Sequence, residues 1–489
     1  MKKSRCIAHA GCDRREFINR SALFTAGTLF MGGPALRAGD GTIVMPTIRK
    51  GPASSYVPVI RAAFVRRKEA YGMRWPGAVY DGETARKKYT EALAATAVSL
   101  GVDLHTREVP IHSLAEADEW LSEARATDAD GLMVVLLDRQ EHAWPTAQKA
   151  ADSGIPTIIF SPLGTSFTTN TIHLAGKPGC VIYSTNDFSQ PAYGMKMLKA
   201  GARMKRTRCV VIKGEERMET TLADTHIALQ YVPAGTFIKI YNQMQVTGEM
   251  HSMADEYLAQ AKALRHATRE DVLNGIKSYL VAGQILEEEK ADAISMDCLG
   301  ALGNEEVSLP CISWSRMNDD GIPAACEADI GAIASHVMVQ YLFDRPGFQQ
   351  DPVADTSDDT IIGAHCSCPT RLNGFSEPPE PFELVHHHGN RDAVPRTIWK
   401  EGQRVTCLDM LPADGHTGQR SELLISTGEV VENMSVPPSG GCVVSVKVKF
   451  DDKHEVLSYP GFHQLFFYGD FKRELKEFGQ LHGFRPVLI

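Results

Sequence analysis

The sequence predicts an α/β protein in which two doubly wound, Rossmann-like α/β domains precede a β-rich, barrel-like C-terminal domain. Two observations favour this fold class. Short apolar runs alternate with helical stretches over most of the first 343 residues, which is typical of parallel βαβ units. After residue 343 the helical patterns give way to β-type runs divided by Gly- and Pro-rich turns. A chain of 489 residues is also too long for one ordinary core.

The first α/β domain is expected over residues 57–175. Helical patterns near 83–100 and 114–126 separate its apolar runs. These strand-like runs are VPVIRAAF (57–64), VDLHTREV (102–109), GLMVVLL (131–137) and IPTIIF (155–160).

The second α/β domain is expected over residues 176–345 and the β-rich domain over 346–489. Strand-like runs at 208–214 and 291–297, with helical patterns at 252–264 and 269–290, indicate the second domain. In the third, the β-type runs are 360–365, 381–388, 404–411 and 442–450, and the segment 469–484 has the apolar spacing of a terminal helix.

The N-terminus resembles a twin-arginine export signal. Arg14 and Arg15 precede an apolar run that is too short to span a membrane comfortably. Asp13 and Asn19 take the places of the usual Ser and Lys. The alternative is an amphipathic N-terminal helix or a disordered tail.

The export interpretation predicts a signal peptide over residues 1–38 and a linker over 39–56, rich in Gly, Pro and Ser. The protein is then expected in the periplasm, with no membrane association after signal removal. The net charge of −9 and the lack of a basic block argue against a nucleic-acid partner. The 11 cysteines include no CxxC pair, so most are expected to be free thiols.

Two acids of the segment GIPAACEADIGA (321–332) stand at the start of a predicted helix. Ile330, Ile333 and Val337 fall on one helical face immediately afterwards. Asp329 suits a helix N-terminus, where a carboxylate meets free N–H groups. Successive helical residues are ~100° apart, so Glu327 and Asp329 would diverge by about 200°. We therefore predict that Glu327 alone serves a site and that its partners lie elsewhere.

Three further residues have settings that suit chemistry. Asp351 lies in RPGFQQDPVAD, where Pro and Gly favour an irregular loop. His365 closes an apolar strand-like run, and His463 follows a Gly turn among aromatic residues. Taken singly, such acids and histidines are more often structural than metal-ligating.

Three segments resemble the C-terminal signature of the L-fucose/L-arabinose isomerase superfamily, and the resemblance covers residues 291–489. They are LPCISWSRMNDDGIPAACEADIGA, FQQDPVADTSDDTIIGAHCSCP and GFHQLFFYGDFKRELKEFGQLHGF. The superfamily holds a divalent cation, commonly manganese, with acid and histidine side chains.

The resemblance implies that Glu327, Asp351 and His463 hold such a cation. His365 matches a further histidine ligand of the arabinose side of the superfamily. Glu327 and Asp351 would also act as the acid/base pair. Oxygen ligands with imidazole favour Mn²⁺, or Mg²⁺, over ions that select thiolates, so Cys326, Cys366 and Cys368 are expected to be packed thiols.

Substrate contacts are predicted at Arg74, Trp75, His387 and Gln464. Arg74 and Trp75 follow the first strand, where α/β folds place ligands, although a packed Trp and a solvated Arg would also explain them. The resemblance further implies a homo-oligomer, a trimer or hexamer, in which the N-terminal domain completes a neighbour's site.

The function predicted from these residues is metal-dependent interconversion of an aldose and a ketose through a cis-enediol(ate), with a small-molecule sugar as substrate. Two alternatives stay open. One is an exported sugar-binding protein that closes tandem α/β domains over its ligand, and the other is a related epimerase or lyase acting on a hydroxylated substrate.

Overall fold

A computed structural model describes residues 51–69, 72–74, 79–139, 141–302, 307–387, 391–413, 419–434, 442–452 and 455–489. The predicted signal peptide and residues 39–50 of the predicted linker lie outside these residues. Within the described part of the chain, no helix combines the length and the apolar character that crossing a membrane requires.

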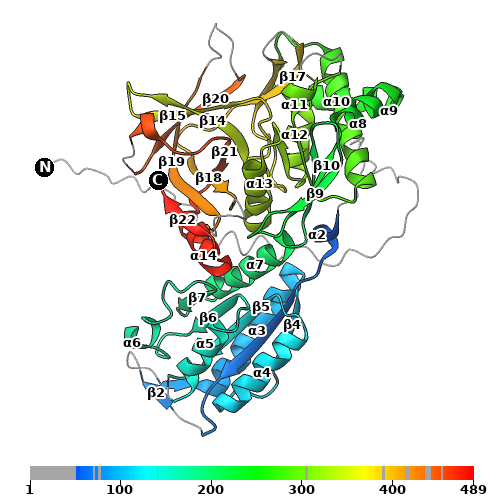
Figure 1. Ribbon diagram of the computed structural model, residues 1–489. Helices are drawn as coiled ribbons and strands as arrows, with labels where there is room; N and C mark the ends of the chain where they lie inside the picture. The colour runs from blue at the N-terminus through cyan, green and yellow to red at the C-terminus, as the bar shows by residue number, and fades with distance from the viewer. Residues whose placement is uncertain are drawn as a thin grey trace, which may run out of the picture. The chain divides into compact units, whose positions relative to one another are not determined.

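The first region contains a five-stranded parallel sheet of order β4-β1-β5-β6-β7, which is doubly wound (Figure 1). Helices α3 and α7 pack on one face, and α4 and α5 pack on the other. The region consists of β1 (Val59–Val65), the hairpin β2 (Gly72–Arg74) and β3 (Val79–Asp81), α3 (Gly82–Leu100), β4 (Asp103–Thr106), α4 (Leu114–Ala126), β5 (Gly131–Leu136), α5 (Ala143–Ala151), β6 (Thr157–Ser161), α6 (Thr168–Thr171), β7 (Cys180–Ser184) and α7 (Ser189–Met204).

Strand β7 lies beyond the boundary predicted at residue 175. It pairs in parallel with β6, from Thr157 and Cys180 to Ser161 and Ser184. The first sheet therefore extends through Ser184, because the backbone of β7 pairs along its length with β6.

The second region is built on a sheet of order β13-β12-β8-β10-β9, parallel except for the edge strand β9. Its elements are β8 (Arg208–Ile212), β9 (Met218–Thr221), β10 (Ala228–Val232), α8 (Ala234–Gln243), α9 (Gly248–Gln260), β11 (Ala263–Leu264), α10 (Arg269–Glu288), β12 (Ala293–Met296), α11 (Cys298–Leu302), α12 (Cys311–Asp319), β13 (Ala324–Cys326) and α13 (Ile330–Phe343).

The C-terminal region is an antiparallel barrel. Strands β18, β21, β14, β15, β20 and β19 pair in that order, and a further β19–β18 pairing closes the ring. Its elements are β14 (Phe348–Asp355), β15 (Thr360–His365), β16 (Phe382–His387), β17 (Arg391–Thr397), β18 (Arg404–Leu411), β19 (Glu422–Asn433), β20 (Val444–Phe450), a 3₁₀ turn (Val456–Ser458), β21 (Gln464–Tyr468), α14 (Lys472–His482) and β22 (Arg485–Leu488). The predicted fold class, α/β regions followed by a β-barrel domain, is therefore confirmed.

One strand predicted in the β-rich domain, at 381–388, lies outside the barrel. It is β16, which forms a separate sheet with β17 and with the short β11 of the second region. In addition, Asp351 occupies strand β14, opposite Ala364 of β15, and not the irregular loop that its Pro and Gly neighbours predict. Pro352 is accommodated because it follows Asp351 near the middle of a strand whose pairing partner changes there, from β21 to β15.

A buried carboxylate fixes the start of the described chain. Helix α2 (Pro52–Ser55) lies within the predicted linker, and its amides at Ala53 and Ser54 donate to Asp292 over 3.2 and 3.0 Å. The Ser54 hydroxyl and the Arg208 amide donate to the same carboxylate, which is 2% exposed. Asp292 immediately precedes β12, so this contact joins the α2 segment to the second sheet.

Replacing Asp292 with Ala should lower the free energy of unfolding by at least about 2 kcal/mol, since a buried donor left unpaired costs about 1–3 kcal/mol. The urea midpoint measures this effect, and limited proteolysis should show faster cleavage near residues 51–58. The exposed Asp255→Ala variant is the control, because an exposed ion pair adds little stability. An unchanged urea midpoint for Asp292→Ala would show that the hydrogen bonds to this carboxylate do not stabilise the fold.

Candidate metal centre

Four predicted residues meet where the carboxyl end of β13 faces one end of the barrel. Glu327 follows β13, Asp351 lies in β14, His365 ends β15 and His463 immediately precedes β21. Donor atoms of Glu327, His365 and His463 all lie within 4.8 Å of one another, a spacing at which three side chains can hold one metal ion.

The individual distances place His463 at the middle of the group. Its Nε2 atom lies 3.1 Å from Asp351 Oδ1 and 3.5 Å from Glu327 Oε2. His365 Nε2 lies 3.7 Å from Glu327 Oε1. His463 Nε2 and Asp351 Oδ1 are both buried, and neither has a partner with hydrogen-bond geometry. Buried polar atoms of this kind need a partner, and a cation between carboxylates and imidazoles would supply it.

A left-handed turn brings Glu327 and Asp329 to the same histidine. Glu327 (φ 62°) and Ala328 (φ 52°) both adopt left-handed backbone angles. The prediction that the two acids diverge assumed helical geometry and is wrong, because the chain reverses between β13 and α13. Glu327 approaches Nε2 of His463, while Asp329 Oδ2 lies 3.0 Å from Nδ1.

Asp329 therefore has two roles where a helix start alone was predicted. Its Oδ1 atom accepts from the Ala332 amide over 2.8 Å and caps α13, as expected. Its Oδ2 atom accepts from Nδ1–H of His463, which leaves Nε2 directed toward Glu327 and Asp351. A carboxylate that orients a ligating imidazole in this way typically strengthens metal binding.

Burial and neighbouring charges shift the ionisation of the site. Burial raises the pKa of Glu327, the positive charge on His463 opposes this, and the negative charges of Asp351, Asp297 and Asp329 raise it further. Burial lowers the pKa of His463, but its interactions with Asp329 and Asp351 outweigh that effect and raise the pKa to about 10. The metal-free site therefore carries an imidazolium at neutral pH.

Two acids near the site were not found from the sequence. Asp297 follows β12 at the same end of the parallel sheet as Glu327, and its charge contributes to the raised pKa of Glu327. Asp297 directly follows an apolar strand in the sequence, and this position is the pattern that could have identified it. Asp409 of β18 is buried and accepts from the Phe462 amide over 3.2 Å, which helps to place His463. Burial raises the pKa of Asp409 to about 7.

The predicted substrate contacts lie in different surroundings. Gln464 is fully buried. Its side-chain oxygen accepts hydrogen bonds from Gln350 Nε2 and Cys407 Sγ, and its side-chain nitrogen donates to the Pro460 carbonyl. His387 is buried on β16, next to an irregularity in the β16–β17 ladder. Arg74 ends β2, and Trp75 lies outside the described residues. The described cysteines are free thiols, and Cys326, Cys366 and Cys368 are buried, as the sequence predicts.

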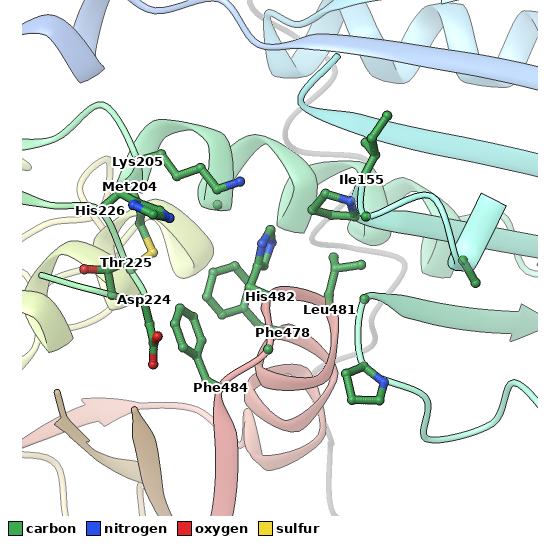
Figure 2. Close-up of a pocket in the computed structure, with 17 residues that line it drawn as sticks. Ile155, Met204, Lys205, Asp224, Thr225, His226, Phe478, Leu481, His482 and Phe484 are labelled. Carbon is green, nitrogen blue, oxygen red and sulfur yellow. The ribbon is translucent and has the colours of Figure 1, made fainter. Parts of the chain in front are cut away.

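A cavity of about 310 Å³ lies away from this centre, and none of the described site residues lines it. It opens near the amino ends of β6 and β7, opposite the sheet edge where α/β folds bind ligands. Figure 2 shows Lys205, Asp224 and His226 on one side of it and an apolar group of Phe478, Leu481 and Phe484 on the other.

Comparison with known proteins gives a weak link to sugar isomerases. No family model matches the sequence. Sulfoquinovose isomerases of Priestia aryabhattai and Priestia megaterium (strain ATCC 12872 / QMB1551) are each 22% identical over 201 residues, which is 40% of this chain. The match spans 44% of the length of these curated relatives.

One solved structure also aligns with part of the chain. A solute binding protein of an ABC transporter from Burkholderia multivorans covers 50% of this chain and 80% of its own, with 11% identity and a TM-score of 0.18. A score this low carries no argument about fold or function.

Replacing Asp329 should separate its two roles. We expect Asp329→Ala to weaken Mn²⁺ binding about 10–100-fold, as loss of a carboxylate behind a ligating His does. It should also lower the free energy of unfolding by about 0.5–2 kcal/mol through loss of the helix cap. Asp329→Asn retains a capping oxygen, so its stability should stay near wild type while metal affinity falls.

Calorimetric titration and urea unfolding measure the two effects. Asp81→Ala is the matched control, because Asp81 caps α3 through the amides of Glu83 and Thr84 and lies in the first region. The Asp81→Ala variant should be less stable through loss of its helix cap, and its Mn²⁺ affinity should be unchanged. Wild-type metal affinity in both Asp329 variants would contradict the orienting role.

Metal binding should release about one proton near neutral pH, because coordination requires a neutral imidazole and the pKa of His463 is about 10. Attraction between the imidazolium and its carboxylates stabilises the metal-free fold below the unfolded pKa of about 6.5. This stabilisation is lost as the pH rises through about 10. Mn²⁺ affinity should therefore rise with pH across the neutral range.

Calorimetry in buffers of different ionisation enthalpy measures the released proton. The variant His105→Gln, which changes an exposed histidine of β4, should release the same number as the wild type. Binding without proton release, or with an affinity that does not change with pH, would show that His463 is not a ligand.

Proposed function

We propose that the protein is a metal-dependent isomerase that interconverts an aldose and a ketose through a cis-enediol(ate). The observation that carries the proposal is the convergence of Glu327, His365 and His463, with Asp351 beside them, at the carboxyl end of a parallel strand. The distant similarity to sulfoquinovose isomerases supports the same reaction class.

The residues fit a divalent cation that takes oxygen and imidazole ligands. Glu327 and Asp351 offer carboxylate oxygens, and His365 and His463 offer ring nitrogens. This donor set suits Mn²⁺, with Mg²⁺ as the second choice. When bound, such an ion would polarise the sugar oxygens and stabilise negative charge on them.

The side chains of the site can perform the proton transfers of an isomerase. Burial raises the pKa of Glu327, which suits this carboxylate to act as the base that takes the proton from C2 and returns it to C1. Asp351 moves the second proton between O1 and O2. Asp329 keeps His463 oriented throughout, since it holds Nδ1 on the side away from the two carboxylates.

Further parts of the proposal rest on the sequence. The signature segments resemble the L-fucose/L-arabinose isomerase superfamily, which favours an aldose substrate and a trimeric or hexameric assembly. Arg14 and Arg15 favour export by the twin-arginine route to the periplasm. Arg74, Trp75, His387 and Gln464 stay predicted substrate contacts.

Isotope exchange tests the proposed reaction. We expect incubation with L-fucose, L-arabinose and sulfoquinovose in deuterated water, with Mn²⁺, to place deuterium at C2 of at least one recovered aldose. Glu327→Gln should reduce this exchange by at least about 100-fold, since it removes the base. Glu429→Gln, an exposed change on β19, is the matched control and should retain full exchange.

Mass spectrometry and NMR of the recovered sugars give the readout. Sugar binding without metal and without exchange would favour a binding protein. Exchange at a carbon other than C1 or C2, with no ketose formed, would favour an epimerase or lyase.

A further inference from the structure

Four thiols lie near the candidate metal centre, within or packed against one apolar cluster. They come from both the second α/β region and the barrel region: Cys298, Cys326, Cys366 and Cys442. Cys326 directly precedes Glu327, and Cys366 directly follows His365. Two of the proposed metal ligands therefore each have a cysteine as their direct neighbour in the sequence.

Two of these thiols lie side by side at the end of the β15–β20 ladder. His365 pairs with Val444 in antiparallel register, so the next residues of the two strands bring Cys366 alongside the Cys442–Val443 segment. The side chains of Cys366 and Cys442 lie close enough to interact with each other. The hydroxyl of Ser445 donates to the Cys442 carbonyl over 3.0 Å and holds this backbone in place.

The two partners differ in exposure. Cys366 is 4% exposed, whereas Cys442 is only partly buried. Cys442 also lies within electrostatic range of Glu327, Asp351 and His463. A small oxidant that reaches the edge of the site therefore meets the thiol of Cys442 first, with a second thiol already beside it.

We propose that Cys366 and Cys442 form a disulfide under oxidising conditions and that this bond weakens metal binding at the adjacent centre. The inference rests on the proposed metal site. With hydrogen peroxide as oxidant, the Cys442 thiol gains an oxygen to give a sulfenic acid, and one water leaves. The Cys366 thiol then attacks that sulfur, which releases a second water and forms the S–S bond. The two thiols lose two electrons in total and the peroxide gains them.

Geometry explains the effect on the metal. A disulfide brings two sulfurs to about 2.05 Å and restricts the dihedral angle between them. Cys366 must move toward β20 to meet this, and the preceding residue, His365, moves with it. Metal–ligand distances in protein sites stay within about 0.2 Å of their standard values. Oxidation therefore displaces one imidazole of the Glu327, His365 and His463 group.

A second thiol pair provides an internal comparison. Cys298 and Cys326 also lie close enough to interact, beside the β12–β13 pairing of Met296 with Cys326. Both are buried, at 8% and 3% exposure. Peroxide has poorer access to this pair, so it stays reduced while Cys366 and Cys442 react.

The test uses the full-length protein, reduced and then treated with hydrogen peroxide. After removal of peroxide, peptide mass spectrometry identifies any linked cysteines and calorimetry measures Mn²⁺ affinity. We expect a Cys366–Cys442 link, at least tenfold weaker Mn²⁺ binding, and full recovery with dithiothreitol. Cys442→Ser should bind Mn²⁺ like the reduced wild type before and after peroxide, and Cys298→Ser should respond like the wild type.

Each other outcome overturns the inference. The absence of the Cys366–Cys442 link shows that the thiols do not react together, and a link with unchanged Mn²⁺ affinity shows that they do not act on the metal. If peroxide lowers the Mn²⁺ affinity of Cys442→Ser as much as that of the wild type, the group that peroxide oxidises is not Cys442. Failure of the reduced protein to bind Mn²⁺ would overturn the metal centre itself, and the peptide masses distinguish that failure from a failure of the thiol chemistry.

Discussion

The charge on His463 joins the second parallel sheet to the barrel, and among the described residues these two share no backbone hydrogen-bond ladder. The imidazole stands at the start of a barrel strand, yet Asp329 at the N-terminus of α13 and Glu327 after β13 both approach it. A buried imidazolium is costly unless carboxylates surround it, and three carboxylates reach this one. The position of the barrel end relative to the parallel sheet must therefore stay fixed for the three carboxylates to surround His463.

Backbone strain accompanies this arrangement. Glu327, Ala328 and His463 are non-glycine residues with left-handed angles, a conformation that costs about 1–2 kcal/mol per residue. Barrel and sheet contacts hold the turn in place: the Cys326 amide donates to Gln349 Oε1 over 2.8 Å, and the Ala328 amide donates to the Met296 carbonyl over 2.9 Å. Strain that surrounding structure maintains is typical of functional sites, where it sets the direction of side chains.

The same packing places hard and soft ligand atoms close together. Carboxylates and imidazoles face the centre, and thiols lie directly behind two of the residues that supply them. This packing supports the ligands from behind, while the Glu327 and Asp351 side chains are 34% and 29% exposed. The packing also makes the geometry of the site sensitive to any covalent change among the thiols, because a close-packed interior transmits small displacements.

Local patterns in the sequence were sufficient to predict the fold class, whereas four residues of the candidate site were assigned from a family resemblance. Apolar periodicity identified the parallel strands, since alternation and run length depend on which faces are buried. The settings of Glu327, Asp351, His365 and His463 marked them as candidates, but their assignment as metal ligands came from the resemblance to the L-fucose/L-arabinose isomerase superfamily. Even so, Asp351 was assigned to a loop, because its pairing with Ala364 depends on a neighbouring strand that no local pattern specifies.

Tertiary structure alone decided how these residues meet. The sequence determined that Asp329 could cap a helix, because a cap needs only its own neighbours along the chain. That Asp329 also orients His463 depends on a contact between residues 134 positions apart. The reversal at Glu327 and Ala328 likewise depends on the β12 and β14 residues that hold it. Long-range contacts and left-handed angles leave no periodic signal, so only the folded chain shows how the site residues meet.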